Sequence, residues 1–443
     1  METIKDAPIG RASARLLWLS EKETCKMRKI LKIALIIAVL LVVGMIAVVM
    51  FQMYKPVLDA SKEIDEVDDY ALSVTDKLVD RDVKVIGFGE ATHGNKEFQE
   101  LKLDVLKTLV RDNGVSAICF EMDYAEGLLV NEYISGKSDM SIEDVFSHIS
   151  FDIYRTEEIK ELLEWMKAYN ADSRDGYLEF YGFDIQNPEV DVYVIDEFVK
   201  RNHIPLESES ISAYLAGEFR FKDARMKNVF YSLETYRETL SDNQYRNLAG
   251  IDKVLKCFDN ILLSKELAAI PSGNSIAYGT YRDKAMKDNI IGISDSVGYP
   301  IMITGHNGHV GYAGSYVKTM GAYLKEALGD DYFVIGTDYF KTSTSLSTEK
   351  GRKNYTYYSA DPLSYQAKRL GTYYLRFDDL KDNEKLNSIV TGKMPTGSLG
   401  EGFKPLNKFL PGTIRLYAPP TDLYDGMIFV YEASPFTILN DGM

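Results

Sequence analysis

Carboxylates and imidazoles follow three short apolar runs of this sequence. Glu90 and His93 follow one run, Glu121 follows a second, and His306 and His309 follow a third. Three of the chain's five histidines belong to this set. A histidine can act as a general base, a carboxylate can fix its tautomer, and a second histidine or a cation can face a developing oxyanion. These side chains therefore suit the direct activation of water for hydrolysis.

Glycines surround both histidine motifs, GFGEATHG at 87–94 and GHNGHVG at 305–311. Glycine allows the backbone to turn sharply and to come close to a ligand. The first motif lacks the Lys-Ser/Thr pair of a P-loop and the spacing of GxGxxG, which disfavours a phosphate cradle. The sequence also lacks the GxSxG nucleophile elbow and HExxH, so a serine hydrolase and a zincin are disfavoured. We expect no metal and no cofactor, although two or three histidines with glutamates are also a zinc or iron ligand set.

Positioning these groups requires strands that end at the same edge of a sheet. From residue 83 onward, strand-like runs alternate with helical patterns, which predicts a three-layer α/β fold with a central, mostly parallel sheet flanked by helices. The carboxyl ends of parallel strands share one edge, so the side chains should converge there. The predicted strands are 83–88, 117–120, 178–181, 300–304, 332–335 and 427–431. Amphipathic helices are predicted at 98–109 and 159–169, the second capped by Thr156.

Other parts of the body are less regular in their pattern. Asp184 and Asp338 also follow strand-like runs, where a single aspartate is as often a helix cap. Residues 191–298 read as helical throughout, which predicts an all-helical subdomain inserted into the α/β core. The region 341–415 is rich in Ser, Thr, Tyr, Gly and Lys and is expected to be irregular.

An uncharged apolar stretch at 33–51 is long enough to cross a hydrocarbon core of about 30 Å. Arg28, Lys29 and Lys32 precede it and acidic residues follow it from Asp59 on, so the positive-inside rule places the N-terminus in the cytoplasm. A cleaved signal peptide is the alternative, but the stretch exceeds the length of a signal-peptide core. We therefore expect a single-pass cell-membrane protein with an extracellular catalytic domain.

The expected domain organisation follows from these patterns. A start at Met27 is an alternative that would shorten the cytoplasmic tail. The expected segments are a cytoplasmic tail at 1–32, a transmembrane signal anchor at 33–54, a linker with helix at 55–82, an α/β catalytic core at 83–190 and 299–435, and a helical insert at 191–298.

Charge and cysteine content exclude other classes. Lys and Arg number 51 against 66 Asp and Glu, a net charge of −15 that repels a phosphate backbone, so nucleic acid is not an expected partner. Three cysteines, Cys25, Cys119 and Cys257, are too few for a disulfide scaffold. Cys119 lies in an apolar run and is expected to be a buried thiol, with a bridge to Cys257 as the alternative.

Several motifs occur in a fixed order along residues 70–435. They are GEATHGNKEF, FEMD, YRTEEIKELLEWMKAYN, FYGFDIQ, YRDKAMKDNI, GHNGHVGY and MGAYLKEALGDDYFVIGTDYF. In these motifs the chain closely resembles the erythromycin esterase family, and GEATHG and HNGHV are the most specific pieces. The resemblance implies an α/β core with a helical subdomain and water-mediated hydrolysis of an ester or macrolide lactone without a metal.

The resemblance also implies roles for individual residues. His93 would be the general base, Glu90 and Glu121 would orient it or the water, and His306 and His309 would bind or polarise the carbonyl.

Four further residues are expected to contact the substrate: Arg155, Lys102, Asp184 and Asn307. Lys102 stands where many members appear to carry Arg, and Tyr154 precedes Arg155 where Trp is frequent. Arg155 would supply a cation, with a salt bridge to a neighbouring glutamate as the alternative.

The membrane anchor departs from the family, whose antibiotic-inactivating members are typically soluble and cytoplasmic. The leading interpretation is an extracytoplasmic esterase or lactonase that acts on a small-molecule substrate, with a response to antibiotics as the role that the family suggests. One alternative is an inactive binding or scaffold protein of the cell envelope. The other is a metal-dependent hydrolase, or a metal or haem carrier. The sequence names neither the substrate nor a protein partner.

Overall fold

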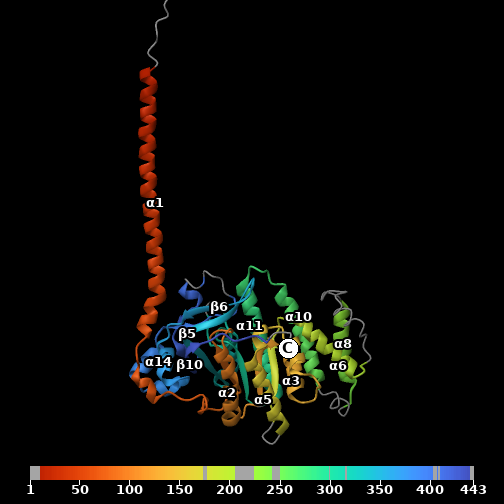
Figure 1. Ribbon diagram of the computed structural model, residues 1–443. Helices are drawn as coiled ribbons and strands as arrows, with labels where there is room; N and C mark the ends of the chain where they lie inside the picture. The colour runs from red at the N-terminus through yellow and green to blue at the C-terminus, as the bar shows by residue number, and fades with distance from the viewer. Residues whose placement is uncertain are drawn as a thin grey trace, which may run out of the picture.

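A computed structural model describes residues 10–172, 177–204, 224–241, 250–298, 300–314, 317–402, 407 and 410–439. Within them an eight-stranded sheet is covered by helices on both faces, and one long helix, α1 (Gly10–Ala60), projects from the body (Figure 1). The predicted α/β class, with a mostly parallel central sheet and an N-terminal apolar helix, is confirmed.

The central sheet has the strand order β3-β2-β4-β1-β5-β10-β7, and β6 pairs with β5. Only β6 and β7 run antiparallel to their neighbours. A separate two-stranded sheet joins β8 and β9. The bounds are β1 (Val85–Glu90), β2 (Ala117–Asp123), β3 (Glu179–Asp184), β4 (Ile301–His306), β5 (Tyr332–Thr348), β6 (Gly351–Tyr358), β7 (Tyr373–Arg376), β8 (Met394–Gly397), β9 (Arg415–Ala418) and β10 (Gly426–Ala433). All six predicted strands are present.

Two hydrophobic layers cover the faces of the sheet, because successive side chains of a strand point to opposite faces. In β2, Ala117 and Cys119 pack into one layer, and Ile118 and Phe120 pack into the other. The helices of the first layer include α3 (Tyr124–Ile134), α6 (Pro188–Arg201), α10 (Ile251–Ala268), α11 (Ser275–Val297), α13 (Met320–Leu328), α14 (Pro362–Leu370) and α15 (Glu384–Thr391). Those of the second include α2 (Lys96–Asn113), α4 (Ile142–His148) and α5 (Glu157–Asp172).

The described residues form one further helix of 16 residues, one short helix and six 3-10 turns. They are α8 (Ala224–Thr239), α12 (Asn307–Val310) and the 3-10 turns η1 (Asp65–Asp69), η2 (Asp152–Tyr154), η3 (Gly329–Asp331), η4 (Phe377–Leu380), η6 (Pro411–Thr413) and η7 (Pro420–Asp422).

Both predicted amphipathic helices form. Their apolar stripes are buried, and α2 ends at Gly114, whose φ of 67° suits a glycine C-cap. The hydroxyl of Thr156 accepts a hydrogen bond from Ile159 N at 3.3 Å, as expected of the residue that caps α5.

The expectation that 341–415 is irregular is wrong. β5 continues through Thr348 and forms an antiparallel hairpin with β6. The polar side chains of β5 are buried with partners, since Thr342 Oγ1 donates to Asn95 Oδ1 at 3.0 Å and Thr344 Oγ1 lies 3.2 Å from Thr92 Oγ1. The polar composition of this segment suggested a loop, but the segment forms a strand because its hydroxyl groups have hydrogen-bond partners inside the protein.

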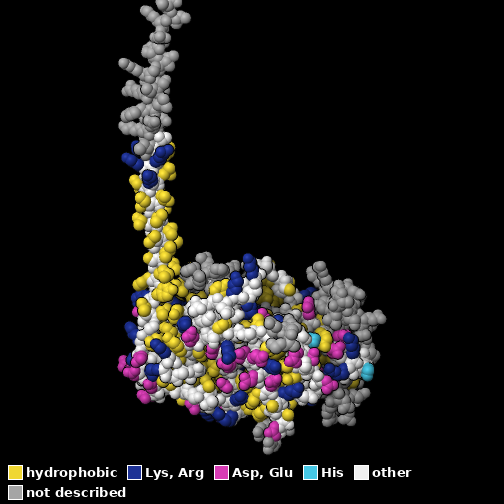
Figure 2. Space-filling model, in the orientation of Figure 1, with side chains coloured by type: hydrophobic (Ala, Val, Ile, Leu, Met, Phe, Trp, Pro, Cys, Tyr) yellow, Lys and Arg dark blue, Asp and Glu magenta, His cyan; other side chains and the backbone are white. Residues whose placement is uncertain are grey.

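Among the described residues, Lys26–Ala60 of α1 is the one helical stretch that is apolar and long enough to cross a membrane. None of its apolar window is buried, and Figure 2 shows Lys and Arg side chains at the far end of its hydrophobic band. Residues 1–9 of the predicted cytoplasmic tail lie outside the described residues.

The last turns of α1 are fastened to the body. Pro56 has no N–H, so the carbonyl of Gln52 lacks its usual helical donor. Arg415 faces this position, with Nη1 3.5 Å from Gln52 O and Nη2 donating to Met53 O at 3.0 Å. After α1 the chain stays on the body, where Ile64 N donates to the Gln366 side chain at 3.0 Å. The helix α1 and the body are thus joined by specific contacts.

The region between β3 and β4 is helical in its described part, where it contributes α6, α8, α10 and α11. Residues 205–223 and 242–249 of the predicted helical insert lie outside the described residues. The division of the chain into a core and an insert remains a prediction.

A glycine on α3 allows this helix to lie against β3. A Cβ atom at Gly127 would stand 2.0 Å from Gly182 N, whereas a Cβ at Gly292 of α11 would have nothing within 4 Å. We expect Gly127→Ala to lower the free energy of unfolding by about 1–3 kcal/mol or more through overpacking. Gly292→Ala is the control and should raise it by about 0.5–1 kcal/mol, because alanine favours the helix. Chemical denaturation measures both, and equal effects would contradict the close approach.

Candidate active site

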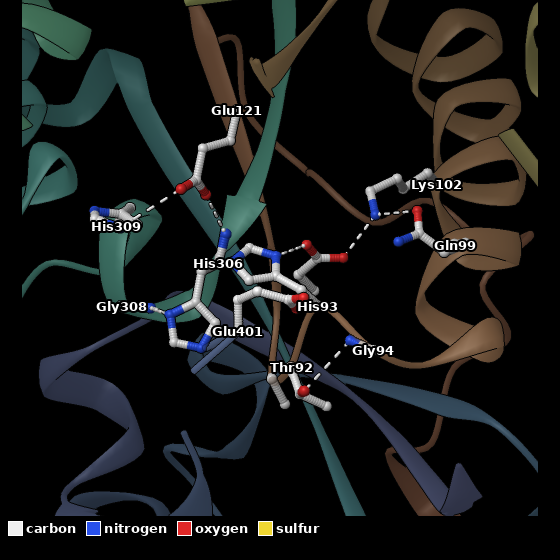
Figure 3. Close-up of polar contacts among 12 residues, drawn as sticks. Thr92, His93, Gly94, Gln99, Lys102, Glu121, His306, Gly308, His309 and Glu401 are labelled. Carbon is white, nitrogen blue, oxygen red and sulfur yellow. Dashed lines mark hydrogen bonds and ion pairs between the residues drawn. The ribbon is translucent and has the colours of Figure 1, made fainter. Parts of the chain in front are cut away.

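The carboxyl ends of β1, β2 and β4 gather the acids and imidazoles. In the register of the sheet, Glu90 of β1 is paired with His306 of β4. Figure 3 shows His93, Glu121 and His309 around the same point. The ring centroids of His93 and His306 are 5.2 Å apart, and those of His306 and His309 are 6.4 Å apart. Two stretches more than 200 residues apart in sequence thus meet at one edge.

Glu90 links His93 to Lys102. One carboxylate oxygen lies 2.6 Å from His93 Nδ1, and the other accepts a hydrogen bond of 2.6 Å from Lys102 Nζ. The ammonium also donates to Gln99 Oε1 at 2.7 Å. Burial alone would raise the pKa of Glu90, but Lys102 and His93 lower it to about 2. Burial lowers the pKa of Lys102. The pair forms a fully buried ionic support beneath the histidine.

His93 is held by one ring nitrogen and keeps the other available. Because Nδ1 faces the Glu90 carboxylate, the neutral ring carries its proton on Nδ1, and Nε2 is the basic nitrogen. Nε2 has no hydrogen bond within the described residues, and the side chain keeps 10 % exposure. Burial lowers the pKa of His93, but Glu90 and then Glu121 and Glu401 raise it above its ordinary value.

His306 differs from His93 because its available ring nitrogen is a hydrogen-bond donor and not a base. Its Nδ1 accepts a hydrogen bond of 3.1 Å from Gly308 N, so the proton of the neutral ring lies on Nε2. Burial and the neighbouring histidines lower the pKa of His306 to about 3, which keeps the ring neutral near pH 7. Nε2 is buried and has no hydrogen-bond partner in the described part of the chain. A buried donor without a partner is costly unless a ligand or water accepts from it.

Arg282 of α11 supplies a cation at the same edge. Its guanidinium donates to Glu121 Oε1 at 2.8 Å and to Asp184 Oδ2 at 2.6 Å. Glu121 also accepts from His306 N at 2.8 Å. Burial raises the pKa of Glu121, but His309 and Arg282 lower it well below its ordinary value. Glu121 is therefore an ionised carboxylate that joins β2, β4 and α11.

His309 lies between an acid and the guanidinium. Its Nδ1 is 2.5 Å from Asp283 Oδ1, and Arg282 Nη1 donates to Nε2 at 3.1 Å. Glu121 Oε1 lies farther from Nε2, at 3.5 Å. The contact with Arg282 requires an unprotonated Nε2, so the neutral ring carries its proton toward Asp283. Burial lowers the pKa of His309, but Glu121 and Asp283 raise it overall, so a second proton would turn Nε2 from Arg282 to Glu121.

Seven of the nine predicted side chains belong to this connected cluster. Asn307 donates through Nδ2 to Thr337 O at 2.8 Å and thereby joins α12 to β5. Arg155 ends η2, where its backbone N donates to Asp152 O at 3.0 Å. Two cations, Lys102 and Arg282, donate hydrogen bonds to carboxylates of this cluster. The members are Glu90, His93, Lys102, Glu121, Asp184, His306 and His309.

Asp338 differs from its predicted position at a strand end. Since β5 continues to Thr348, Asp338 lies within the strand, where its carboxylate accepts from Gly397 N at 2.9 Å. It therefore has a structural role between β5 and β8.

Sequence reasoning missed three residues of the cluster. Arg282 and Asp283 belong to the motif YRDKAMKDNI, which was the available signal. Glu401 has no such motif. Figure 3 shows it beside His93, and its charge raises the pKa of that imidazole, while Arg352 Nη2 donates to it at 3.1 Å.

Among the described residues, no three His, Cys, Asp or Glu side chains are arranged to hold a metal ion. Cys119 and Cys257 are both buried free thiols, so the alternative of a bridge between them is wrong.

Comparison with known proteins gives consistent relatives. The family model described as Erythromycin esterase matches residues 110–433. An erythromycin esterase type II from Escherichia coli is 25 % identical over 312 residues, which is 61 % of this chain and 73 % of that protein. A putative hydrolase, YbfO, from Bacillus subtilis is 21 % identical over 426 residues, 82 % of this chain and 86 % of that protein.

Solved structures share the fold. A Bacillus cereus protein superposes with a TM-score of 0.67 at 20 % identity, covering 87 % of this chain and 99 % of that one. A succinoglycan biosynthesis protein gives a TM-score of 0.64 at 20 % identity, covering 86 % and 94 %. A variant of the erythromycin esterase EreC in its open conformation gives 0.52 at 14 % identity, covering 83 % and 94 %.

Proposed function

The chain belongs to the erythromycin esterase family, and from this premise we propose that it is a membrane-anchored, extracytoplasmic hydrolase of carboxylic esters or lactones. The family supports a hydrolase. The proposal of an ester or lactone hydrolase rests on two imidazoles with different roles, whose ring centroids are 5.2 Å apart. His93 offers a basic nitrogen, and His306 offers an N–H without a partner among the described residues.

In the proposed reaction His93 is the general base. Its Nε2 takes a proton from a water molecule, and the oxygen of that water attacks the carbonyl carbon of the ester. The imidazolium that forms is stabilised by Glu90, whose negative charge is maintained by Lys102. Direct attack by an activated water molecule needs no covalent intermediate with the protein.

The carbonyl oxygen becomes an oxyanion in this step. His306 Nε2–H is a neutral donor without another partner among the described residues. It is therefore suited to donate a hydrogen bond to this oxyanion and to stabilise its negative charge. The tetrahedral intermediate then collapses, the bond between the carbonyl carbon and the alcohol oxygen breaks, and His93 returns its proton to the alkoxide. The products are a carboxylic acid and an alcohol, or a hydroxy acid from a lactone.

Arg282, Glu121 and His309 form the other wall of the proposed site. Arg282 is bound to two carboxylates, so its charge is compensated and its direction is fixed. We assign this group to substrate orientation, with Asp184 as the residue that positions the guanidinium.

We propose that α1 is the membrane anchor. Its apolar stretch is exposed along its whole length and carries basic residues at its far end, which supports a span with the N-terminus in the cytoplasm and the body outside.

The test is a screen of the purified full-length protein against aryl esters, aliphatic lactones and macrolides. We expect acid release without a kinetic burst, and no acylated protein by mass spectrometry during turnover. A burst with an acylated side chain would contradict direct attack by water, and no hydrolysis across the panel would favour a binding protein.

The pH dependence of the rate tests the role of His93. The base must be unprotonated, and its pKa is raised, so kcat/KM should rise with pH through a midpoint above 6.5. Glu90→Gln removes the carboxylate that raises this pKa, so the midpoint should move to lower pH. Glu100→Gln, which alters an exposed pair with Lys96, is the control and should leave it in place. An unchanged midpoint in a folded Glu90→Gln protein would exclude His93 as the titrating base.

A further inference from the structure

The catalytic edge of the sheet and the apolar part of α1 lie on the same side of the body. β5 runs parallel to β1 and β10 and then continues into the hairpin with β6, so this hairpin marks the carboxyl edge. Figure 1 shows the hairpin and the turn between α10 and α11 on the side from which α1 rises. The proposed active site at this edge therefore faces the region that a membrane around α1 would occupy.

The contacts at the base of α1 set the distance between that membrane and the body. Arg415 binds carbonyls of Gln52 and Met53, directly after the apolar stretch 33–51, and Met53 packs against the hydrophobic core. Figure 2 shows the hydrophobic band of α1 continuing down to the level of the upper edge of the body. No free linker separates the two parts, so a bilayer spanned by α1 would meet this edge.

Exposed apolar side chains occur on the two segments that build the site at this edge. We call them the apolar rim. Ile276 and Tyr278 are 60 % and 37 % exposed and precede Arg282 on α11. Leu410 and Tyr417 are 45 % and 46 % exposed and lie within five residues of Arg415 along the chain, in the segment that follows Glu401.

This clustering distinguishes the rim from scattered exposed residues, which are ordinary on protein surfaces. Outside α1, the four rim side chains are among only seven large hydrophobic residues that are exposed in the described part of the chain. In a chain of net charge −15, the Asp and Glu side chains visible in Figure 2 lie mainly below the upper edge. Among the side chains coloured by type in that view, acidic ones are thus fewer at the membrane-side edge than below it.

We propose that the catalytic edge rests on the outer surface of the bilayer, with the apolar rim in the interfacial layer, and that the substrate is an amphiphilic ester held in that bilayer. This inference rests on the proposed function. Tyrosine favours the interface, where its apolar ring and its polar hydroxyl are both accommodated, and aliphatic side chains bury apolar area at the boundary with the acyl chains. The ester group rises from the interface to His93, water cleaves its acyl carbon–oxygen bond, the acid remains in the bilayer and the alcohol is released.

The position of the rim is tested without catalysis. Full-length protein in which Trp18 and Trp165 are replaced by Phe is reconstituted into vesicles of brominated phosphatidylcholine. Tyr417→Trp introduces a fluorophore at the rim, and Tyr177→Trp introduces one at the opposite edge, just before β3, where Tyr177 is 40 % exposed. We expect quenching at position 417 to exceed that at position 177 several-fold. Equal quenching would overturn the orientation.

The substrate class is tested by comparing two esters in phosphatidylcholine vesicles. One is the water-soluble 4-methylumbelliferyl butyrate and the other is 4-methylumbelliferyl oleate within the bilayer. Ile276→Ser with Tyr417→Ser should lower the rate on the oleate on the order of ten-fold, because two interfacial side chains are lost. The rate on the butyrate should be unchanged, and Tyr177→Ser should alter neither rate.

The two proposals fail in different ways. Equal loss on both esters, or no preference of the wild type for the oleate, would overturn the membrane-borne substrate while leaving the hydrolase intact. Hydrolysis of neither ester, nor of any in the wider panel, would overturn the proposed function and the substrate class together, and the quenching measurement would still decide the orientation.

Discussion

Replacing His93 by asparagine is expected to lower kcat for a soluble ester by about 10²- to 10⁴-fold, the contribution of a positioned general base. An asparagine amide can stand near the place of Nδ1 and donate to Glu90, so the buried ion pair with Lys102 keeps a third partner. It has no nitrogen that accepts a proton from water. KM should change little, because the water and the base act in the transition state rather than in substrate binding.

The matched control is His203→Asn. His203 is exposed and has a φ of 50°, which asparagine tolerates well, so neither activity nor stability should change. Steady-state kinetics and a thermal melt are measured for both variants. If the His93→Asn protein folds and retains most of its kcat, His93 is not the general base of the reaction.

Replacing Lys102 by methionine is expected to lower the free energy of unfolding by about 3–5 kcal/mol, because it leaves a buried carboxylate without its cation. Both side chains of the pair are fully buried, and the ammonium lies 2.6 Å from Glu90 Oε2. Methionine has a similar length and no charge, so the loss is electrostatic rather than a cavity. The pKa of Glu90 should rise, which weakens its support of an imidazolium at His93 and lowers kcat as well.

Two further variants separate this effect from packing. Lys107 lies on the same helix and is exposed, with Nζ 5.5 Å from the centroid of the Trp165 ring. Lys107→Met should therefore lower the free energy of unfolding by less than about 1 kcal/mol. Glu90→Gln added to Lys102→Met removes the unpaired charge and should restore part of the lost stability. If the double variant is no more stable than Lys102→Met in urea denaturation, the ion pair is not the source of the loss.

The proposed membrane anchor would change how such an active site is used. Substrate concentration at a bilayer surface depends on partitioning, so an enzyme fixed there would encounter amphiphilic esters more often than water-soluble ones. Wild-type selectivity between the oleate and the butyrate would therefore reflect the position of the enzyme as well as the shape of its site.

Local patterns in the sequence determined much of this protein. The uncharged stretch 33–51 predicts the apolar helix, because its composition alone decides whether a segment tolerates a membrane. The strand-like runs predict the parallel sheet and thereby the edge at which Glu90, Glu121 and His306 meet. The pairing of Glu90 with His93 is local too, since only Ala91 and Thr92 stand between them.

Only the tertiary structure decided which cation joins this edge and where β5 ends. Arg282 is 161 residues from Glu121 and 98 from Asp184, and no periodicity relates them. The packing of α11 against β3 and β4 places Arg282 there. The polar end of β5 became a strand because Asn95 and Thr92 satisfy its hydroxyls. A side chain's chemistry is fixed by its type, but its partners are fixed by how distant elements pack, and that is settled by the whole fold.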